Sequence, residues 1–566
     1  MKKNTMSLAV ALLAASSCLA EADTVQEASG AAAREETLAL MTFDFGSACG
    51  IYATGDSKAR IVKGGSHPGS RGMLEIHNRT EKWNSGEFNL TGRVEDRGRY
   101  RFAANVRQDS AGSGTFQLSL KIVDGSGTHY ELVAKKEAKK GEWTHIEGEY
   151  RLGEGVKNLY PYIELYSSTD AFFVDDVSFV ALDAPVRDLS LEKDLAPLKD
   201  AFRAAGITCG ASVGDAVLGD PTGLQRELLV RHFDSLSPEN QLKAQFVLDH
   251  GTSVANLERH QRDAALDFGP AKTWFDFAKA HGMRVSAQAL VWFMLTPEWF
   301  FHDDYDTAKP LASRELMLAR MENYIRRVLG WCEAEYPGLV RSWVVVNEGV
   351  DGDAKPHVRD DLFFKTIGED YIARAFEFAG KYRPKTDCIF LYNDYNMEYY
   401  AEKTDFVLDY LKKHGLVSRG LVDGIGFQCH VKMDWPGVSE IRKNCAKVAK
   451  ARLAAEVTEM DVQFGRSQVA KFPSEREAFE RQGARFEKIL RAFLDARCDG
   501  LDLRNVTWWG LTDAYTWLTD FHGEQNFPLL FDRDNKAKPA FFGVLKAVGA
   551  AAADAPAAPA RARDVR

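Results

Sequence analysis

The stretch Ser342-Trp-Val-Val-Val-Asn347 is a short, almost wholly apolar run that ends in a polar residue, and Glu348 follows it directly. A short apolar run bounded by polar residues is typical of a strand that is buried on both faces. Seven further runs of this kind lie on either side of it, at residues 207–213, 233–237, 284–292, 388–393, 424–431, 454–462 and 506–512. The pattern predicts eight buried strands.

Amphipathic helical segments alternate with these strands. The clearest of them cover residues 311–336, 370–381, 404–414 and 475–497. Eight apolar strands that alternate with helices are the signature of a (β/α)8 TIM barrel, in which the chemistry lies at the C-terminal ends of the strands. We therefore predict an α/β barrel domain over residues 192–548.

The chain before the barrel has a different periodicity. Tyr100-Arg-Phe-Ala-Ala-Asn-Val106 and Phe116-Gln-Leu-Ser-Leu-Lys-Ile-Val123 alternate apolar and polar residues, and Gly, Asp and Ser separate such runs. Period-two alternation with turn residues between the runs indicates antiparallel strands. The expected fold of residues 38–183 is an all-β jelly-roll sandwich, with a linker to the barrel near residues 183–191.

The two ends of the chain have the composition of processing or linker segments. Lys2 and Lys3 precede an apolar run over residues 8–15 and small residues up to Ala22, which predicts a secretory signal peptide over residues 1–22. That run is too short to span a bilayer. A secreted or periplasmic protein follows, with lipid anchoring through Cys18 as the alternative. The Ala/Pro-rich tail over residues 549–566 predicts disorder.

The charge distribution and the cysteine spacing limit which partners and which cysteine chemistry we expect. The net charge of −9 is spread along the chain without a long basic run, so nothing would neutralise a phosphate backbone and nucleic acid is not an expected partner. The eight cysteines form no CxxC pair, which favours buried free thiols such as Cys429. We expect a monomer.

Polar side chains gather where the predicted strands end. Asn347 and Glu348 end the fourth strand, Gln428 and His430 the sixth, and Glu459 the seventh. Hydrolysis of a glycosidic bond needs two carboxyls, one to protonate the leaving oxygen and one to attack or to activate water. Two glutamates across a barrel mouth therefore predict a glycosidase. The spacing leaves open which glutamate has which role.

The barrel segment resembles glycoside hydrolase family 10, the large family of endo-β-1,4-xylanases. The resemblance covers residues 192–548 and rests on seven motifs in order: Ser237-Pro-Glu-Asn-Gln-Leu-Lys243, Leu290-Val-Trp292, Trp343-Val-Val-Val-Asn-Glu348, Tyr392-Asn-Asp-Tyr-Asn396, Gly424-Ile-Gly-Phe-Gln-Cys-His430, Val457-Thr-Glu-Met-Asp461, and Trp508-Trp-Gly-Leu-Thr-Asp513 with Trp517.

The resemblance implies a role for each matching residue. Glu348 would be the acid/base and Glu459 the nucleophile, with Asn347 bonding the 2-hydroxyl of the sugar. His430 would orient Glu459, and Asp461 would hold His430. The implied substrate-binding residues are Glu239, Asn240, Lys243, Gln288, Trp292, Gln428, Trp509 and Trp517.

Four positions depart from the family pattern. Gln288 and Phe293 replace histidines, Leu295 replaces a glutamine, and Val344 replaces an aspartate. A leucine cannot bond a hydroxyl, and a site that loses a donor discriminates less between sugars. The joint loss of the histidine at Gln288 and the aspartate at Val344 would avoid an unpaired buried charge. The departures leave the choice of glycan open.

The sandwich segment resembles carbohydrate-binding modules of families 4, 9 and 22, through Trp143-Thr-His-Ile-Glu-Gly-Glu-Tyr150 and Phe172-Phe-Val-Asp-Asp-Val-Ser-Phe179. Trp83 and Tyr130 are the candidate glycan-stacking residues. A structural calcium ion held by Asp44, Asp175 and Asp176 is the one metal expected, because calcium prefers oxygen ligands.

These observations predict a retaining endo-β-1,4-xylanase that needs no cofactor for catalysis. Two alternatives remain. The first is a retaining hydrolase of another β-1,4-glycan, such as mixed-linkage glucan. The second is a catalytically inactive barrel that only captures glycan, against which the presence of Glu348, Glu459 and His430 together argues.

Overall fold

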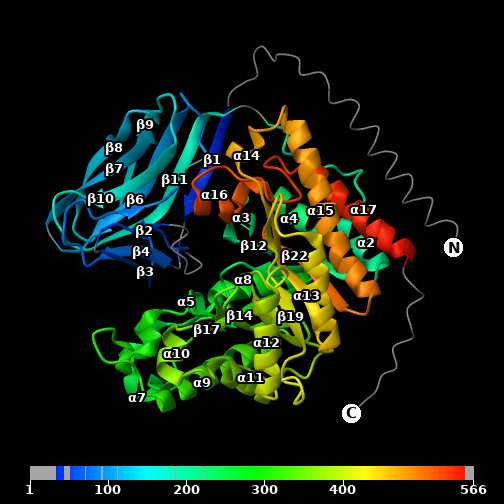
Figure 1. Ribbon diagram of the computed structural model, residues 1–566. Helices are drawn as coiled ribbons and strands as arrows, with labels where there is room; N and C mark the ends of the chain where they lie inside the picture. Colours follow the sequence, from blue (N-terminus) through cyan, green and yellow to red (C-terminus); the bar gives the residue numbers. More distant parts are fainter. Residues whose placement is uncertain are drawn as a thin grey trace.

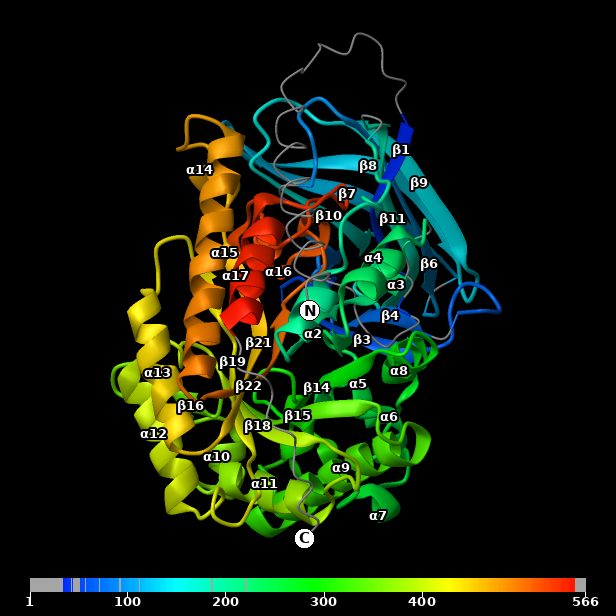
Figure 2. The same ribbon diagram turned by 90° about the vertical axis from the view of Figure 1, so that its right-hand side faces the viewer.

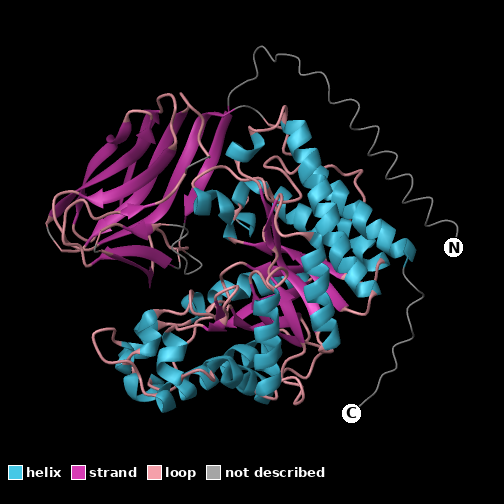
Figure 3. Cartoon of the chain, in the orientation of Figure 1, coloured by secondary structure: helices cyan, strands magenta, loops and turns pink. Residues whose placement is uncertain are grey.

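The computed structural model describes residues 34–41, 43, 51–55, 57–70, 72–90, 93–110, 112–184, 187–218, 220 and 222–554. The signal-peptide prediction with Cys18, the calcium candidate Asp44, and the tail beyond Asp554 lie outside these residues. The described part forms a β-sandwich followed by a barrel (Figures 1 and 3). The predicted fold class is confirmed.

The sandwich consists of two antiparallel sheets. One has the strand order β3-β4-β11-β6-β9, with β1 paired to β11, and the other has the order β2-β5-β10-β7-β8. Alternate residues of the strands face inward, so that Phe102 and Phe179 pack with ring centroids 5.8 Å apart. The strands are β1 (Arg34–Met41), β2 (Tyr52–Ala53), β3 (Lys58–Lys63), β4 (Gly72–His77), β5 (Gly86–Glu87), β6 (Arg99–Gln108), β7 (Ser113–Asp124), β8 (Gly127–Lys139), β9 (Thr144–Arg151), β10 (Asn158–Leu165) and β11 (Phe172–Ala184).

Parallel strands close the barrel in the order β12-β13-β14-β15-β18-β19-β21-β22, with β22 paired back to β12. Their apolar side chains are buried on both faces, as the continuous apolar runs predict. The strands are β12 (Thr208–Val213), β13 (Ser235–Pro238), β14 (Arg284–Val291), β15 (Val340–Asn347), β18 (Ile389–Asp394), β19 (Gly424–Phe427), β21 (Ala454–Gln463) and β22 (Asp502–Trp508), together with the short β16 (Val350–Asp351), β17 (His357–Val358) and β20 (His430–Lys432).

Helices surround the barrel (Figures 1 and 2). The four predicted helices correspond to α9, α11, α12 and α15. The α-helices are α2 (Leu198–Ala204), α3 (Asp215–Leu218), α4 (Leu224–His232), α5 (Ala244–Val247), α6 (His250–Ala255), α7 (Leu257–His260), α8 (Gly269–Ala280), α9 (Arg314–Glu335), α10 (Leu362–Ile367), α11 (Tyr371–Lys381), α12 (Ala401–Lys413), α13 (Val438–Lys450), α14 (Arg466–Val469), α15 (Glu475–Cys498), α16 (Trp517–His522) and α17 (Pro539–Asp554). Short 3-10 turns cover Glu298–Phe301, Asp303–Tyr305 and Asp513–Tyr515.

Three boundaries differ from the expectation. The sixth strand is divided into β19 and β20 because Cys429 has a φ of 64°, which interrupts the ladder. The eighth strand begins at Asp502 and ends at Trp508, since its first residues alternate exposed and buried and escape a search for apolar runs. Helix α17 continues past Gly549 to Asp554, as its alanines favour helix.

The segment that connects the two units is bound to the barrel surface. Lys536 Nζ donates to Asp188 Oδ2 at 2.9 Å and to the backbone oxygen of Ser190 at 2.6 Å. Asn535 Nδ2 donates to the backbone oxygen of Leu189 at 3.0 Å. An ion pair of 2.9 Å joins Arg187 to Asp534. Residues 187–190, which precede the barrel, are therefore held against it by hydrogen bonds and an ion pair.

Two further features concern the described residues as a whole. Five of their cysteines are buried free thiols, among them Cys429, and Cys498 is a free thiol at the surface. Within the described ranges, no helix combines the length and the apolar character that crossing a bilayer requires.

Candidate active site and glycan-binding face

Glu348 and Glu459 belong to one hydrogen-bonded network at the barrel mouth. Glu348 directly follows β15 and has a φ of 54°, and Glu459 lies in β21. Asn393, in β18, donates from Nδ2 to Asn347 Oδ1 at 2.8 Å and to Glu459 Oε1 at 2.7 Å. Asn347 Nδ2 in turn donates to Glu348 Oε1 at 3.2 Å. Two amide side chains therefore connect the two carboxyls.

Two more donors fix the carboxyl of Glu348. Gln428 Nε2 donates to Oε1 at 2.9 Å, and the indole nitrogen of Trp292 donates to Oε2 at 3.1 Å. Trp292 therefore does more than supply an apolar wall, because its polar edge positions a carboxyl oxygen. Both residues come from the strand ends at which the motifs placed them.

His430 lies between two carboxylates. Its Nδ1 is 2.9 Å from Asp461 Oδ2 and its Nε2 is 3.3 Å from Glu459 Oε2. Burial lowers the pKa of His430, but the charges and hydrogen bonds of Asp461 and Glu459 outweigh burial and raise that pKa well above its usual value. The imidazolium can then donate to both carboxylates. Trp517 Nε1 also donates to Asp461 Oδ2, at 3.0 Å.

Lys243 brings a buried cation to the same site. Its Nζ lies 4.5 Å from the ring centroid of Trp292 and 5.5 Å from that of Trp509. Asn240 Oδ1 accepts from it at 3.2 Å. Burial lowers the pKa of Lys243, while the charges of Glu459, Glu239 and Glu348 oppose that change. The predicted substrate-binding residues from the second, third and eighth strands thus surround one ammonium group.

The structure adds two residues that sequence reasoning did not select. Asn393 links Asn347 to Glu459, and its position at the end of the fifth strand was the signal that could have found it. Arg359 donates from Nε to the backbone oxygen of Glu348 at 2.8 Å and from Nη2 to the hydroxyl of Tyr395 at 2.9 Å. Arg359 lies in the loop after the β16–β17 pair, where no strand-end pattern points to it.

Two of the four departures from the family pattern, Gln288 and Val344, are neighbours in the barrel sheet. Gln288 and Val344 are direct partners in the register of β14 and β15. Gln288 is buried, and its Nε2 donates to Ser237 Oγ at 3.4 Å. The guanidinium carbon of Arg359 lies over the ring of Phe293, 4.3 Å from the ring centroid. Gln288 and Val344 therefore lie side by side, and because both are uncharged, neither leaves an unpaired buried charge at this point.

The sandwich carries a second group of aromatic side chains on its outer face. By strand alternation, Tyr160, Tyr162 and Glu164 of β10 point away from the core. Tyr130 of β8 is 64% exposed and packs edge-to-face on Tyr162, with centroids 6.3 Å apart. We call Tyr130, Tyr160, Tyr162 and Glu164 the outer face. Trp83, 57% exposed, lies between β4 and β5.

Glu164 is buried although it belongs to this outer face. Burial raises its pKa to about 7, and the nearby charge of Arg79 opposes the rise. A buried carboxyl beside tyrosine rings combines stacking surface with a directed polar group, which is the composition expected of a sugar-binding site. Tyr162 and Glu164 were not selected from the sequence, because only strand pairing shows that they lie beside Tyr130.

The calcium candidates Asp175 and Asp176 mainly accept hydrogen bonds from protein groups. Asp175 Oδ2 accepts from the backbone nitrogen of Ser66 at 2.7 Å and from Ser70 Oγ at 3.0 Å. Asp176 Oδ2 accepts from Ser66 Oγ at 2.5 Å and from Asn105 Nδ2 at 2.9 Å. Among the described residues, no group of three or more His, Cys, Asp or Glu side chains is arranged to hold a metal.

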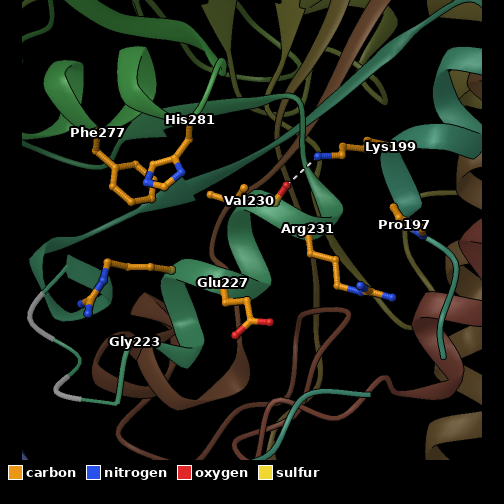
Figure 4. Close-up of a pocket in the computed structure, with 9 residues that line it drawn as sticks. Pro197, Lys199, Gly223, Glu227, Val230, Arg231, Phe277 and His281 are labelled. Carbon is orange, nitrogen blue, oxygen red and sulfur yellow. Dashed lines mark hydrogen bonds between the residues drawn. The ribbon is translucent and has the colours of Figure 1, made fainter. Parts of the chain in front are cut away.

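A separate surface groove lies away from the barrel mouth. Figure 4 shows it at α2, α4 and the end of α8, with Lys199 Nζ donating to the backbone oxygen of Val230 at 2.6 Å. The groove has a volume of about 620 Å³. None of its lining residues belongs to the network of Glu348 and Glu459, so it takes no part in the chemistry of these two carboxyls.

Fold and site together define a class. A (β/α)8 barrel with two linked glutamates at the C-terminal ends of its fourth and seventh strands has the constellation of a glycosidase. The glycosyl hydrolase family 10 model matches residues 197–547, and a carbohydrate binding domain model matches residues 38–170. The chain belongs to glycosyl hydrolase family 10.

Named relatives agree with this membership. The chain is 30% identical over 489 residues to endo-1,4-beta-xylanase A of Thermotoga maritima, which covers 85% of this chain and 43% of that protein. It is 36% identical over 328 residues to endo-1,4-beta-xylanase B of Butyrivibrio fibrisolvens, covering 58% of this chain and 49% of that one. The chain thus spans less than half the length of these two relatives.

Solved structures give the same result. The CBM22-1 and GH10 modules of Clostridium thermocellum endo-1,4-beta-D-xylanase 10B, complexed with xylohexaose, match with a TM-score of 0.55 and 25% identity over 90% of this chain and 97% of that one. Native xylanase 10B of Thermotoga maritima matches with a TM-score of 0.54 and 28% identity over 63% of this chain and all of that one.

Proposed function

We propose that this protein is a retaining endo-β-1,4-xylanase that cleaves internal bonds of xylan by double displacement. The observation that carries the proposal is the network that joins Glu348 to Glu459 through Asn347 and Asn393. Family membership and the names of the relatives favour xylan as the substrate.

In the first step Glu459 attacks the anomeric carbon while Glu348 gives its proton to the leaving oxygen, so that the glycosidic bond breaks and a glycosyl-enzyme ester forms. In the second step Glu348 takes a proton from water, whose oxygen attacks the same carbon and releases Glu459. The contact of Glu459 with the His430 cation supports its role as the ionised nucleophile. This route needs no cofactor.

The decisive experiment measures reducing-sugar release from glucuronoxylan by the wild type, Glu348→Ala and Glu459→Ala. We expect short xylo-oligosaccharides from the wild type and a loss of several orders of magnitude in both variants. Folded wild type that releases no sugar but is retarded in a xylan-containing gel would instead identify a glycan-capture protein.

A second candidate substrate is mixed-linkage glucan, favoured by Gln288, Phe293, Leu295 and Val344. Initial rates on soluble xylan, mixed-linkage glucan and carboxymethylcellulose separate the two candidates. Higher kcat/KM on a glucan than on xylan would replace the xylanase proposal with that of a glucanase.

We further propose that the outer face of the sandwich binds glycan, supported by Tyr130 beside Tyr162 and by the carbohydrate binding domain match. We also propose that the protein is exported to the periplasm or the medium, with a lipid anchor on Cys18 as the alternative, and that it is a monomer.

The mass of the mature protein after expression with residues 1–22 shows whether the signal peptide is removed or Cys18 is acylated. Light scattering gives the oligomeric state. The calcium prediction is tested by the change in Tm on adding calcium or a chelator.

A further inference from the structure

The sandwich contacts barrel loops that border the active site. Lys63 Nζ, at the end of β3, is 3.8 Å from Asp249 Oδ2, at the N-terminus of α6 in the segment after the second barrel strand. Asn158, the first residue of β10, lies against Gly523, at the end of α16; a β-carbon placed on Gly523 would be 3.5 Å from Asn158 Nδ2. The sandwich is thus placed beside the loops of strands two and eight (Figures 1 and 2).

Aromatic rings lead from the nucleophile to that contact. Trp517 begins α16, and its ring lies 5.1 Å from the His430 ring. Phe521 lies 5.1 Å from Trp517 and is 70% exposed. Gly523 lies two residues after Phe521, at the end of the helix. One helix therefore presents two successive rings between the catalytic histidine and the edge of the sandwich.

Further aromatic rings lie on the sandwich side of this contact. Asn158 and Tyr160 are alternate residues of β10 and point to the same face, so Tyr160 stands next to the contact with Gly523. Tyr162 follows at the same spacing, beside Tyr130. The outer face thus begins where the rings of α16 end, and the contacts of Lys63 with Asp249 and of Asn158 with Gly523 join the two parts.

We propose that α16 and the outer face form one continuous binding surface for a single polysaccharide chain. The chain whose scissile bond lies between Glu348 and Glu459 extends past Trp517 and Phe521, crosses from Gly523 to Asn158, and stacks on Tyr160. Flat aromatic rings pack on the apolar faces of pyranose sugars, and Phe521 offers such a ring to the solvent beside Trp517. The occupant is a long β-1,4-xylan chain. This inference rests on the proposed xylanase activity.

The test uses the full chain and a graded series of xylo-oligosaccharides. In the wild type, kcat/KM should continue to rise with length after the barrel cleft is filled. Phe521→Ala should lower kcat/KM roughly tenfold on intermediate and long substrates, and Tyr160→Ala should do so only on the longest ones. The control is Leu311→Ala, which changes an exposed apolar residue before α9. This variant should keep the wild-type kcat/KM at every substrate length. Phe521→Tyr should retain the wild-type length dependence.

The outcomes separate this inference from the proposed activity. If Tyr160→Ala weakens retention on insoluble xylan but leaves the length dependence intact, the sandwich binds a separate chain and the continuous surface is refuted. A plateau of the wild type at the length of the cleft would also refute it. Failure of the wild type on even the shortest cleavable substrates would instead refute the xylanase proposal. Unchanged Tm values show that the variants fold.

Discussion

Arg359 holds the backbone of Glu348, since its Nε donates to the Glu348 carbonyl oxygen at 2.8 Å. The same guanidinium packs on Phe293 at 4.3 Å and bonds the hydroxyl of Tyr395. Glu348 has a φ of 54°, a conformation that a residue with a side chain adopts only when its surroundings hold it there. Arg359 therefore acts as a positioning residue for the acid/base.

Replacing Arg359 by Ala should lower kcat roughly 10- to 100-fold on xylan, because a hydrogen bond to a charged group contributes about 1.5–3 kcal/mol. The loss should be much smaller on aryl xylobiosides with good leaving groups, which need no proton from Glu348. Arg359→Lys should recover part of the rate. Equal losses on both substrate types would show that the role is only structural.

His430 should make the stability of the barrel depend on pH on the alkaline side. Its folded-state pKa is raised, so its contribution to the free energy of unfolding is complete below about pH 6.5 and is lost as the pH rises through the folded-state pKa. His430→Asn should therefore be less stable than the wild type at pH 6, and the gap should narrow at high pH. Tm measured against pH checks this, and a gap that widens with pH contradicts it.

Glu164 should make the stability of the sandwich fall with rising pH as well, but in a more acidic range than His430. Its pKa is raised from 4.5 to about 7 by burial, so the unfolded chain loses this proton first and stability falls as the pH rises between these values. Glu164→Gln should remove that fall. The measurement is the pH dependence of sandwich unfolding, followed by hydrogen exchange on β10. If the stability of Glu164→Gln fell with pH as steeply as that of the wild type, a group other than Glu164 would be responsible for the fall.

The register pair Gln288 and Val344 should respond to substitution as a unit. Val344→Asp alone should destabilise the protein by about 3–5 kcal/mol, since it introduces an unpaired buried charge. Adding Gln288→His supplies a partner and should recover a large part of that loss. Free energies of unfolding of the wild type, the two single variants and the double variant give the coupling energy. Additive losses would refute the idea that the two departures are linked.

Much of this arrangement could be predicted from the sequence, for a physical reason. Strands buried on both faces, such as β15 and β21, leave continuous apolar runs, and their polar ends mark the barrel mouth. Glu348, Glu459 and His430 were selected for that reason. Arg359 was not, because it reaches the site from a loop without periodicity. The start of β22 was missed because the exposed Asp502 and Arg504 interrupt its apolar pattern.

In the sandwich, the sequence alone could predict less of the candidate glycan-binding face. Tyr130 is exposed and could be chosen as an aromatic on a polar strand, but its neighbour Tyr162 and the buried Glu164 become part of one surface only through the pairing of β10, β7 and β8. Pairing between strands distant in sequence depends on the whole sheet. A single strand does not encode it.

The held connection between the two units bears on how such proteins can be recombined. Arg187, Asp188 and Ser190 complete the hydrogen bonding of the barrel segment that contains Lys536, so this stretch is a structural part of the barrel although it precedes the barrel in sequence. A sandwich transplanted from a relative would keep its orientation only if the crossover point lay before Arg187. A junction placed after Ser190 would leave Lys536 without these partners and remove one of the attachments that orient the transplanted unit.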